Sequence, residues 1–327
     1  MDFFSSVPLL VFGILAAAAG GWFGAAIGGN FSFGIAGVAV MVSWGILAAT
    51  GDTVGFDYIA FGPFTGPHVG FAGGVAAAAY AYKRGYIDSG RDVVLPLASL
   101  GKPDVLLVGA GFGAGGFLVQ QGIAQIPWFG SNTDAVALTV VLSALVARLL
   151  VGGGMVHSER KENGWAPSEK WRWLEWQEKP GQYLSIAFFV GILAAAVSIV
   201  LGHAFEGAAA NAHTFTFGIS AICIIFLSLG ANMPVTHHMT IIGGLAAAKF
   251  MPILAGEGFS WTGEWGSGEW TAALIAVLIG AVFAMISATI AELGARWVHN
   301  RGDTHIDPPA FAIWPSTTLV LGIVAFL

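Results

Sequence analysis

The chain is dominated by long apolar runs that are separated by short polar stretches. Most of these runs are long enough to cross the roughly 30 Å hydrocarbon core of a bilayer as a helix. A helix that is apolar on all sides must be buried in protein or in lipid, since none of its faces favours water. The pattern therefore predicts an all-α polytopic membrane protein with about ten transmembrane helices. The predicted segments are approximately 7–28, 31–49, 58–82, 104–125, 134–152, 183–203, 214–230, 234–254, 271–294 and 309–327.

The runs of the first half have counterparts in the second half, in the same order. The letters GILAAA that begin at Gly13 return at Gly191, and the letters FSFGI at Phe31 return as FTFGI at Phe215. Matches in one order along the whole chain indicate an internal duplication rather than a shared bias in composition.

The duplication divides the chain into two repeats and a linker. We predict an N-terminal five-helix repeat over residues 1–152, a cytoplasmic linker over 153–182 and a C-terminal five-helix repeat over 183–327. Asp134 and Asp307 each open the last run of their repeat. Because five is an odd number of spans, the second repeat enters the membrane from the opposite side, which predicts an inverted 5+5 arrangement.

A polar stretch with a helix-breaking proline interrupts each half at the same place. Residues 65–74 read TGPHVGFAGG and residues 235–244 read VTHHMTIIGG, so that His68 aligns with His238. Proline removes a backbone N–H and disfavours a helical conformation in the residue before it. The third helix of each half is therefore predicted to be broken or re-entrant. Polar groups beside broken backbone in both halves predict a substrate site at the bilayer midplane.

The candidate pathway residues are polar or helix-breaking residues near this break or on the fourth helix of each half. Gln121 and Glu292 occupy corresponding positions of those fourth helices. Glu292 has a second interpretation, an ion pair with Arg296 one helical turn later. The full set of candidates is His68, His238, His237, Thr65, Pro67, Asn232, Thr236, Thr240, Gln121 and Glu292.

The basic residues fix an expected orientation. With the N-terminus outside, every one of the 13 Lys and Arg residues except Lys249 falls in or next to a cytoplasmic segment. An excess of Lys and Arg on the cytoplasmic side is the rule for multi-pass proteins. We therefore expect a plasma-membrane protein with both termini extracytoplasmic.

Composition narrows the functional classes. The chain is 56% hydrophobic and only 10% charged, with a mean hydropathy of +0.76, which excludes a soluble domain. Its net charge of −6 argues against nucleic acid as a partner. Cys223 is the single cysteine, so an intrachain disulfide and a cysteine metal cluster are excluded. Met1–Ser6 lacks the basic residues of a cleaved signal peptide, so the first run is expected to be retained.

Three glycine and tryptophan patterns have structural explanations. Gly111, Gly113 and Gly116 fit the dinucleotide-binding pattern, but that pattern requires a βαβ unit, and close helix packing explains the glycines better. The ridge of Gly20, Gly24 and Gly28 predicts helix packing within the bundle, with a homo-oligomer interface as the alternative. The charged, Trp-rich stretch 168–176 predicts a short helix at the cytoplasmic surface of the membrane.

The leading functional hypothesis is a secondary transporter for a small solute, with its site between the repeats. A passive channel for a small polar or weakly charged solute is the alternative. Further alternatives are a membrane-embedded enzyme or lipid-handling protein that uses the histidines, and a structural subunit of a membrane complex. The sequence has no complete hydrolase or redox motif, and helix packing explains its one nucleotide-binding pattern better. We therefore expect neither enzymatic activity nor a cofactor.

Overall fold

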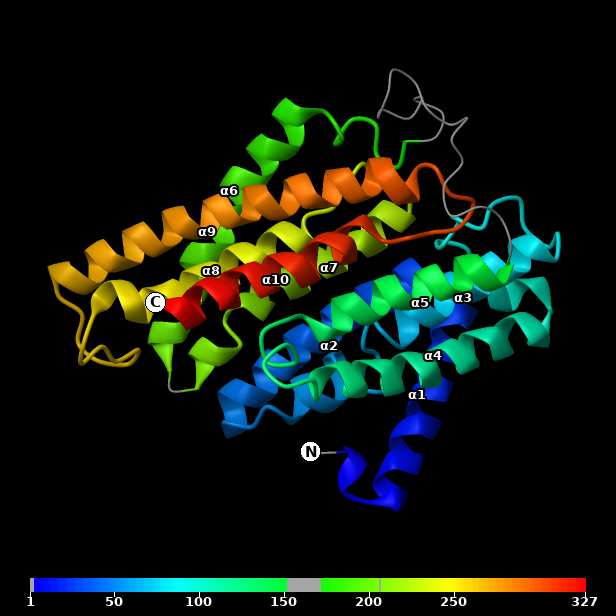
Figure 1. The fold of residues 1–327 in the computed structure, drawn as a ribbon, viewed down its shortest axis with the longest axis horizontal. Helices are drawn as coiled ribbons and strands as arrows, with labels where there is room; N and C mark the ends of the chain where they lie inside the picture. Colours follow the sequence, from blue (N-terminus) through cyan, green and yellow to red (C-terminus); the bar gives the residue numbers. More distant parts are fainter. Residues whose placement is uncertain (1–2, 152–171, 206) are drawn as a thin grey trace.

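The computed structural model describes residues 3–151, 172–205 and 207–327. Within those ranges the chain forms ten α-helices and no β-strand (Figure 1). The α-helices are α1 (Val7–Ile27), α2 (Gly29–Thr50), α3 (Gly70–Lys83), α4 (Pro103–Ala124), α5 (Ala135–Val151), α6 (Pro180–Ala204), α7 (His213–Ser228), α8 (His237–Ala255), α9 (Ser267–Gly294) and α10 (Pro308–Phe326).

The outer surface of this bundle is apolar. Large side chains such as Leu149, Leu193 and Leu274 are each about 60% exposed on α5, α6 and α9. Seven of the α-helices in the described ranges are long and apolar enough to cross a membrane, whereas α5 and α7 are apolar but shorter. Helix α3 has only 14 residues. The protein is therefore a multi-pass helical membrane protein, and the predicted all-α class is confirmed.

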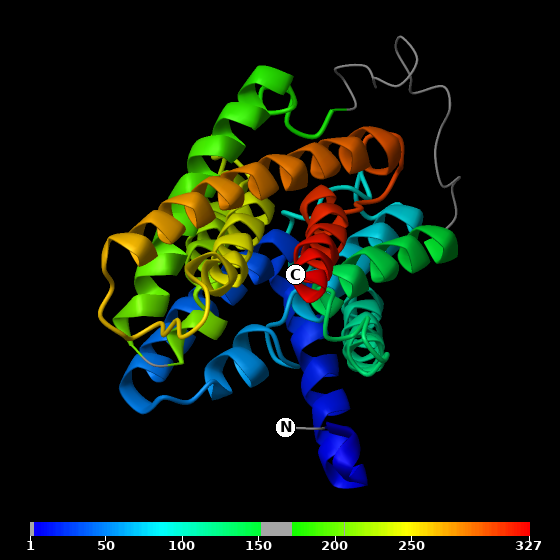
Figure 2. The same ribbon diagram turned by 60° about the vertical axis from the view of Figure 1, so that its left-hand side comes forward.

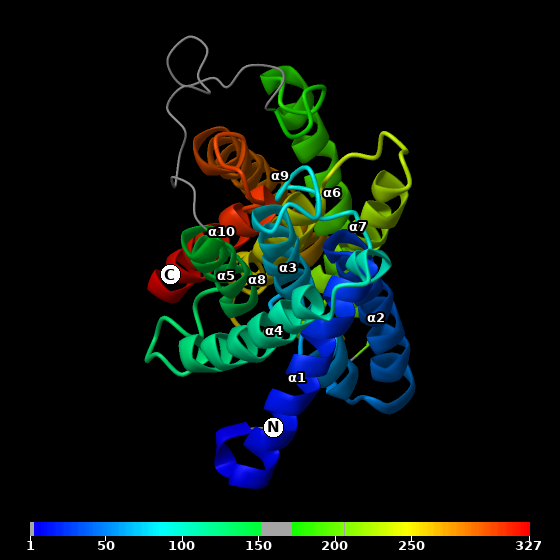
Figure 3. The same cartoon turned by 90° about the vertical axis from the view of Figure 1, so that its right-hand side faces the viewer.

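Each half packs in the same way. Helix α1 packs on α3 and α4 in the first half, and α6 packs on α8 and α9 in the second half. The halves contact each other mainly through α2 with α7 and through α5 with α10, which lie side by side in Figures 1 and 3. Figure 2 shows α10 alongside α5 from a second direction. Helices that meet across the boundary are thus counterparts in the two sequence halves.

The break before α3 has the predicted position. After α2, a π-helical turn η2 (Gly55–Ala60) leads into non-helical residues 61–69, and α3 begins at Gly70. In the second half the non-helical stretch is 229–236, between α7 and α8, and α8 then runs without interruption from His237. The break in that half therefore precedes the helix rather than dividing it, because Pro234 comes before the first helical residue.

Glycines allow the helices of the first half to approach closely. A side chain at Gly24 would overlap the backbone of Gly70 on α3, and one at Gly20 would overlap the carbonyl of Phe64. A side chain at Gly28 would meet the carbonyl of Val94. The predicted helix packing is confirmed for this ridge. The alternative of a homo-oligomer through this face stays a prediction, although segments of the same chain lie against all three glycines.

The segment before α6 is not helical where it is described. Residues 172–179 form bends and turns, and α6 begins at Pro180 rather than near 183. The rest of the predicted Trp-rich helix, 168–171, lies outside the described residues. The Gln177 side chain exchanges two hydrogen bonds of 2.9 Å with the backbone of Val235. This pairing attaches the segment to the break before α8.

Arg148 joins the two halves at this same end of the bundle, since Asn300, which lies between its partners Val298 and Thr304, contacts Glu178. Its side chain is only 1% exposed and belongs to α5 of the first half. It donates hydrogen bonds to the Thr304 hydroxyl (2.9 Å), the Thr304 carbonyl (2.6 Å) and the Val298 carbonyl (2.8 Å) of the second half. A buried guanidinium is stable only when its donors are satisfied, so these bonds hold the segment that leads into α10.

Candidate functional site

A cavity of about 570 Å³ lies between the two halves. Its walls come from η2, the end of α4, the beginnings of α5, α7, α8 and α10, and residues of α2 and α3. We call it the central cavity. Many of its lining residues are counterparts in the sequence alignment of the halves: Phe33 and Phe217, Pro67 and His237, Phe71 and Ile241, Asp134 and Asp307, Ala137 and Ala310, and Val140 and Ile313.

A second cavity, of about 250 Å³, lies on the side of the loop 91–94 and of Trp173. We call it the loop-side cavity. Helix α7 shows how the two cavities are placed: Thr214 and Phe217 line the central cavity, whereas Ile224 and Leu227, further along the helix, line the loop-side cavity. The two cavities are therefore spaced along the helix axis.

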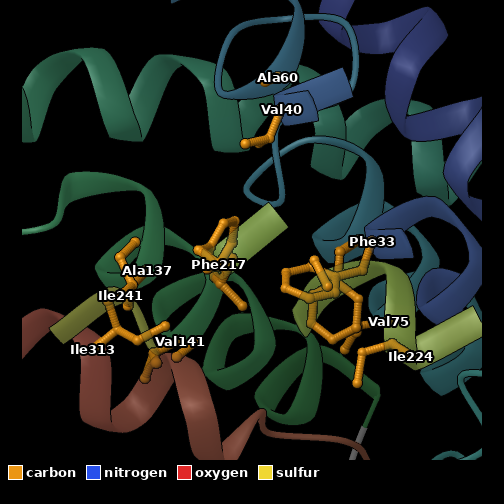
Figure 4. Close-up of a cluster of buried hydrophobic side chains, with 14 of the residues drawn as sticks. Phe33, Val40, Ala60, Val75, Ala137, Val141, Phe217, Ile224, Ile241 and Ile313 are labelled. Atoms are coloured by element: carbon orange, nitrogen blue, oxygen red, sulfur yellow. The ribbon is translucent and has the colours of Figure 1, made fainter. Parts of the chain in front are cut away.

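Four residues line both cavities, and we call this set the partition. They are Phe33, Phe71, His237 and Asp307. The ring centroid of Phe33 lies 4.6 Å from that of His237 and 5.8 Å from that of Phe71. Phe217 packs edge-on against Phe33 at 5.9 Å, and Figure 4 shows these two rings within the buried cluster shared by the halves. Aromatic rings in contact thus separate the cavities.

The two aspartates of the central cavity are held by helix N-termini. Asp134 accepts a 2.8 Å hydrogen bond from the backbone N–H of Ala137, and Asp307 accepts one of 2.8 Å from Ala310. Asp is a favoured N-cap residue, and the helix dipole stabilises a negative charge at this end. The second oxygen of Asp307 lies 3.4 Å from His305 Nε2. Helix N-capping therefore holds one carboxylate from each half at the wall of the cavity.

The scan against protein-family models gives two matches to one family. The family of unknown function DUF7973 matches residues 5–165 and again residues 156–327. The chain belongs to this family. No curated protein and no solved structure matches it. Each of the two matches covers one half of the chain, and they overlap over residues 156–165 in the predicted linker.

Three of the predicted pathway residues line the central cavity of this DUF7973 protein. They are Pro67, His237 and Gln121. Gln121 donates a 2.8 Å hydrogen bond to the side chain of Gln120, which also lines the cavity. His237 is 4% exposed, and its Nδ1 makes no hydrogen bond within the described part of the chain. The structure brings these residues together from three elements of the two halves.

His68 and His238 lie deep in the protein instead, and neither lines the central or the loop-side cavity. His68 is fully buried and His238 is 2% exposed. Their environments correspond: the carbonyl of His238 accepts a 3.0 Å hydrogen bond from Ser287, and the carbonyl of His68 lies against Gly116, the counterpart of Ser287. Their expected pathway role stays a prediction.

The remaining candidates do not line the two cavities either. Thr65 donates to the Ile59 carbonyl, and Asn232 is exposed. Thr236 and Thr240 both donate to the hydroxyl of Ser220, at 3.1 Å and 3.3 Å.

Glu292 is paired with Arg296, as its second interpretation predicted. It faces a small crevice of about 20 Å³ that His238 also lines.

Sequence reasoning missed four central residues, although a signal for each was present. The sequence alignment of the halves pairs Asp134 with Asp307 but does not mark either as a site residue. Phe33 and Phe217 are the second phenylalanines of the matched FSFGI and FTFGI segments. Corresponding positions within matched segments are therefore the signal in the sequence, and apolar residues carry it as well as polar ones.

The site offers carboxylate, amide, imidazole and aromatic groups to a bound molecule. Among the described residues that line the central cavity, none is Lys or Arg. Such a lining can donate and accept hydrogen bonds and can pair with positive charge.

Proposed function

We propose that the protein transports a small solute across the membrane through the central cavity, as a secondary transporter built from two inverted repeats. The observation that carries this proposal is the partition, because two cavities meet at the same four residues from opposite ends of the bundle. A solute that enters one cavity needs only a rearrangement of Phe33, Phe71, His237 and Asp307 to reach the other.

The repeat arrangement is supported by three independent observations. The family model matches each half once. Helices α2 and α7, and helices α5 and α10, contact their own counterparts, as a two-fold axis between the halves requires. Six pairs of corresponding residues line the central cavity, as expected of a site on such an axis. Transporters with inverted repeats carry their substrate sites at this position.

The closed partition favours a transporter over a channel. An open channel would require one continuous passage, whereas here the Phe33 and His237 rings are in contact between the cavities. Alternating access needs such a closed layer on one side of the site while the other side is open.

Flux measurements in proteoliposomes test the proposal. The purified full chain is reconstituted, and uptake of labelled amines, amino acids, sugars and carboxylates is measured with and without proton and sodium gradients. We expect saturable uptake of one class, with accumulation driven by a gradient. Purely downhill flux without saturation would support the passive channel, and no protein-dependent flux for any class would overturn the proposal.

Thiol labelling tests the orientation. The single native cysteine is replaced by Cys223→Ser, and single cysteines are introduced by Ser260→Cys and Ser99→Cys on loops of opposite ends. In intact cells, a membrane-impermeant maleimide should label the Ser260→Cys variant. The Ser99→Cys variant should be labelled only after the cells are lysed. The reverse pattern would contradict extracytoplasmic termini, and equal labelling would contradict the proposed topology.

A further inference from the structure

We infer that the central cavity binds a small organic cation that carries N–H donors, such as an alkylammonium or guanidinium compound. This inference rests on the proposed function, because it names the substrate class of the same site. It depends on the charge, the walls and the hydrogen-bonding capacity of the cavity.

The charged side chains that line the central cavity are all acidic. Asp57, Asp134 and Asp307 contribute carboxylates, and none of the described lining residues is Lys or Arg. Lys249 interacts electrostatically with His213 but does not itself line the cavity. A concave lining with one sign of charge attracts cations and repels anions, although the exposed Asp57 is better screened by solvent than the half-buried or buried Asp134 and Asp307.

The walls favour an organic cation over a bare ion. Five phenylalanines, Phe33, Phe56, Phe61, Phe71 and Phe217, line the cavity together with the carboxylates. Aromatic faces attract ammonium and guanidinium groups and also cover their carbon atoms. Metal ions instead require several ligands, and no group of three His, Cys, Asp or Glu side chains placed to hold a metal ion occurs among the described residues.

A buried imidazole nitrogen without a hydrogen-bond partner also belongs to the site. His237 lines the cavity, is 4% exposed, and leaves its Nδ1 without a hydrogen-bond partner in the described structure. A buried ring nitrogen that makes no hydrogen bond is costly, and in the tautomer that leaves Nδ1 unprotonated an N–H donor from a ligand would satisfy it. This is why the proposed cation carries N–H groups.

Asp134 is the better anchor of the two corresponding aspartates. Asp307 already has His305 at 3.4 Å, whereas the position that corresponds to His305 in the first half is Asn132. In the described structure Asp134 accepts only backbone hydrogen bonds, from Ala137 and Val136. Its charge therefore remains available for a ligand.

Calorimetric binding to the purified full chain in detergent tests the inference without requiring flux. The probes are n-butylammonium, 1-butanol and butyrate, which share one chain length and differ in charge. We expect binding of n-butylammonium alone. Asp134→Asn keeps a good helix cap but removes the charge, and it should weaken this binding about tenfold or more. Asp307→Asn should have a smaller effect. The control Asp52→Asn, an exposed turn aspartate, should leave binding unchanged.

The outcomes separate the inference from the proposed function. Equal binding of 1-butanol or butyrate, no binding of n-butylammonium, or unchanged binding in Asp134→Asn would overturn the inference. Saturable flux of neutral or anionic solutes would overturn it as well but would leave the transport proposal standing. Charge-dependent binding without flux of any cation would support the inference and overturn transport. Unchanged thermal unfolding of each variant establishes that the fold is intact.

Discussion

The Phe33 ring of α2 lies against the His237 imidazole of α8, with centroids 4.6 Å apart and ring planes inclined by 50°. These residues come from different halves of the chain, and both belong to the partition between the cavities. The contact therefore links the packing of the two halves to the passage that we propose between them.

Phe33→Ala should join the two cavities. Removing the ring opens the partition, so downhill solute flux in proteoliposomes should rise several-fold while gradient-driven accumulation falls. Loss of a buried phenylalanine also costs about 3–5 kcal/mol of stability. The matched control is Phe250→Ala, because the Phe250 side chain has the same 8% exposure as Phe33 but lines neither cavity. An equal rise in flux in the control would show that loss of stability, not the partition, causes the leak.

His237→Gln and His238→Gln should differ although the residues are neighbours. Only His237 lines the cavities, so we expect its substitution to impair flux or amine binding and that of His238 to preserve both. Both side chains are almost fully buried, so each change should cost a similar amount, about 1–3 kcal/mol. Flux and thermal unfolding are measured on both variants. A larger functional loss in His238→Gln would move the pathway to the small crevice beside Glu292.

Arg148→Met should destabilise the protein strongly. The change removes three hydrogen bonds between α5 and the segment before α10 and leaves buried carbonyls unsatisfied, a cost of about 3–5 kcal/mol. Thermal unfolding followed by the fluorescence of the 12 tryptophans measures it. The exposed Arg84→Met should change stability by less than about 0.5 kcal/mol. Equal unfolding temperatures for the two variants would refute a joining role for Arg148.

Gly24→Ala should lower the stability of the protein, whereas Gly111→Ala should not. A methyl group at Gly24 would overlap the backbone of Gly70, so we expect a loss of about 1–3 kcal/mol from overpacking. The same group at Gly111 meets open space on an exposed helix face, so stability should be unchanged or rise by up to about 1 kcal/mol. The thermal unfolding midpoints of both variants test this. Tolerance at Gly24 would contradict the close approach of α1 and α3.

Only part of the cavity lining followed from local sequence: Pro67, Gln121 and His237 of the ten predicted residues line the central cavity. The proline break placed the start of α8, and an aspartate before Ala135 or Pro308 forms a helix cap whatever surrounds it. The choice between His237 and His238 did not follow from sequence. Consecutive helical residues point about 100° apart, so one of them faces the cavity only because of how α8 is rotated against its neighbours.

By itself, the sequence determined that the protein is an all-helical membrane protein and where nine of its ten helices begin and end to within a few residues; the predicted segment 58–82 holds α3 only from Gly70. Those properties depend on local hydrophobicity and on residues close in the chain. The tertiary structure alone decided that Phe33 meets His237, that Asp134 and Asp307 share one cavity, and that the Gly20, Gly24 and Gly28 face is covered by the same chain. Such contacts join residues far apart in sequence, so they depend on how complete helices pack and on the register of that packing.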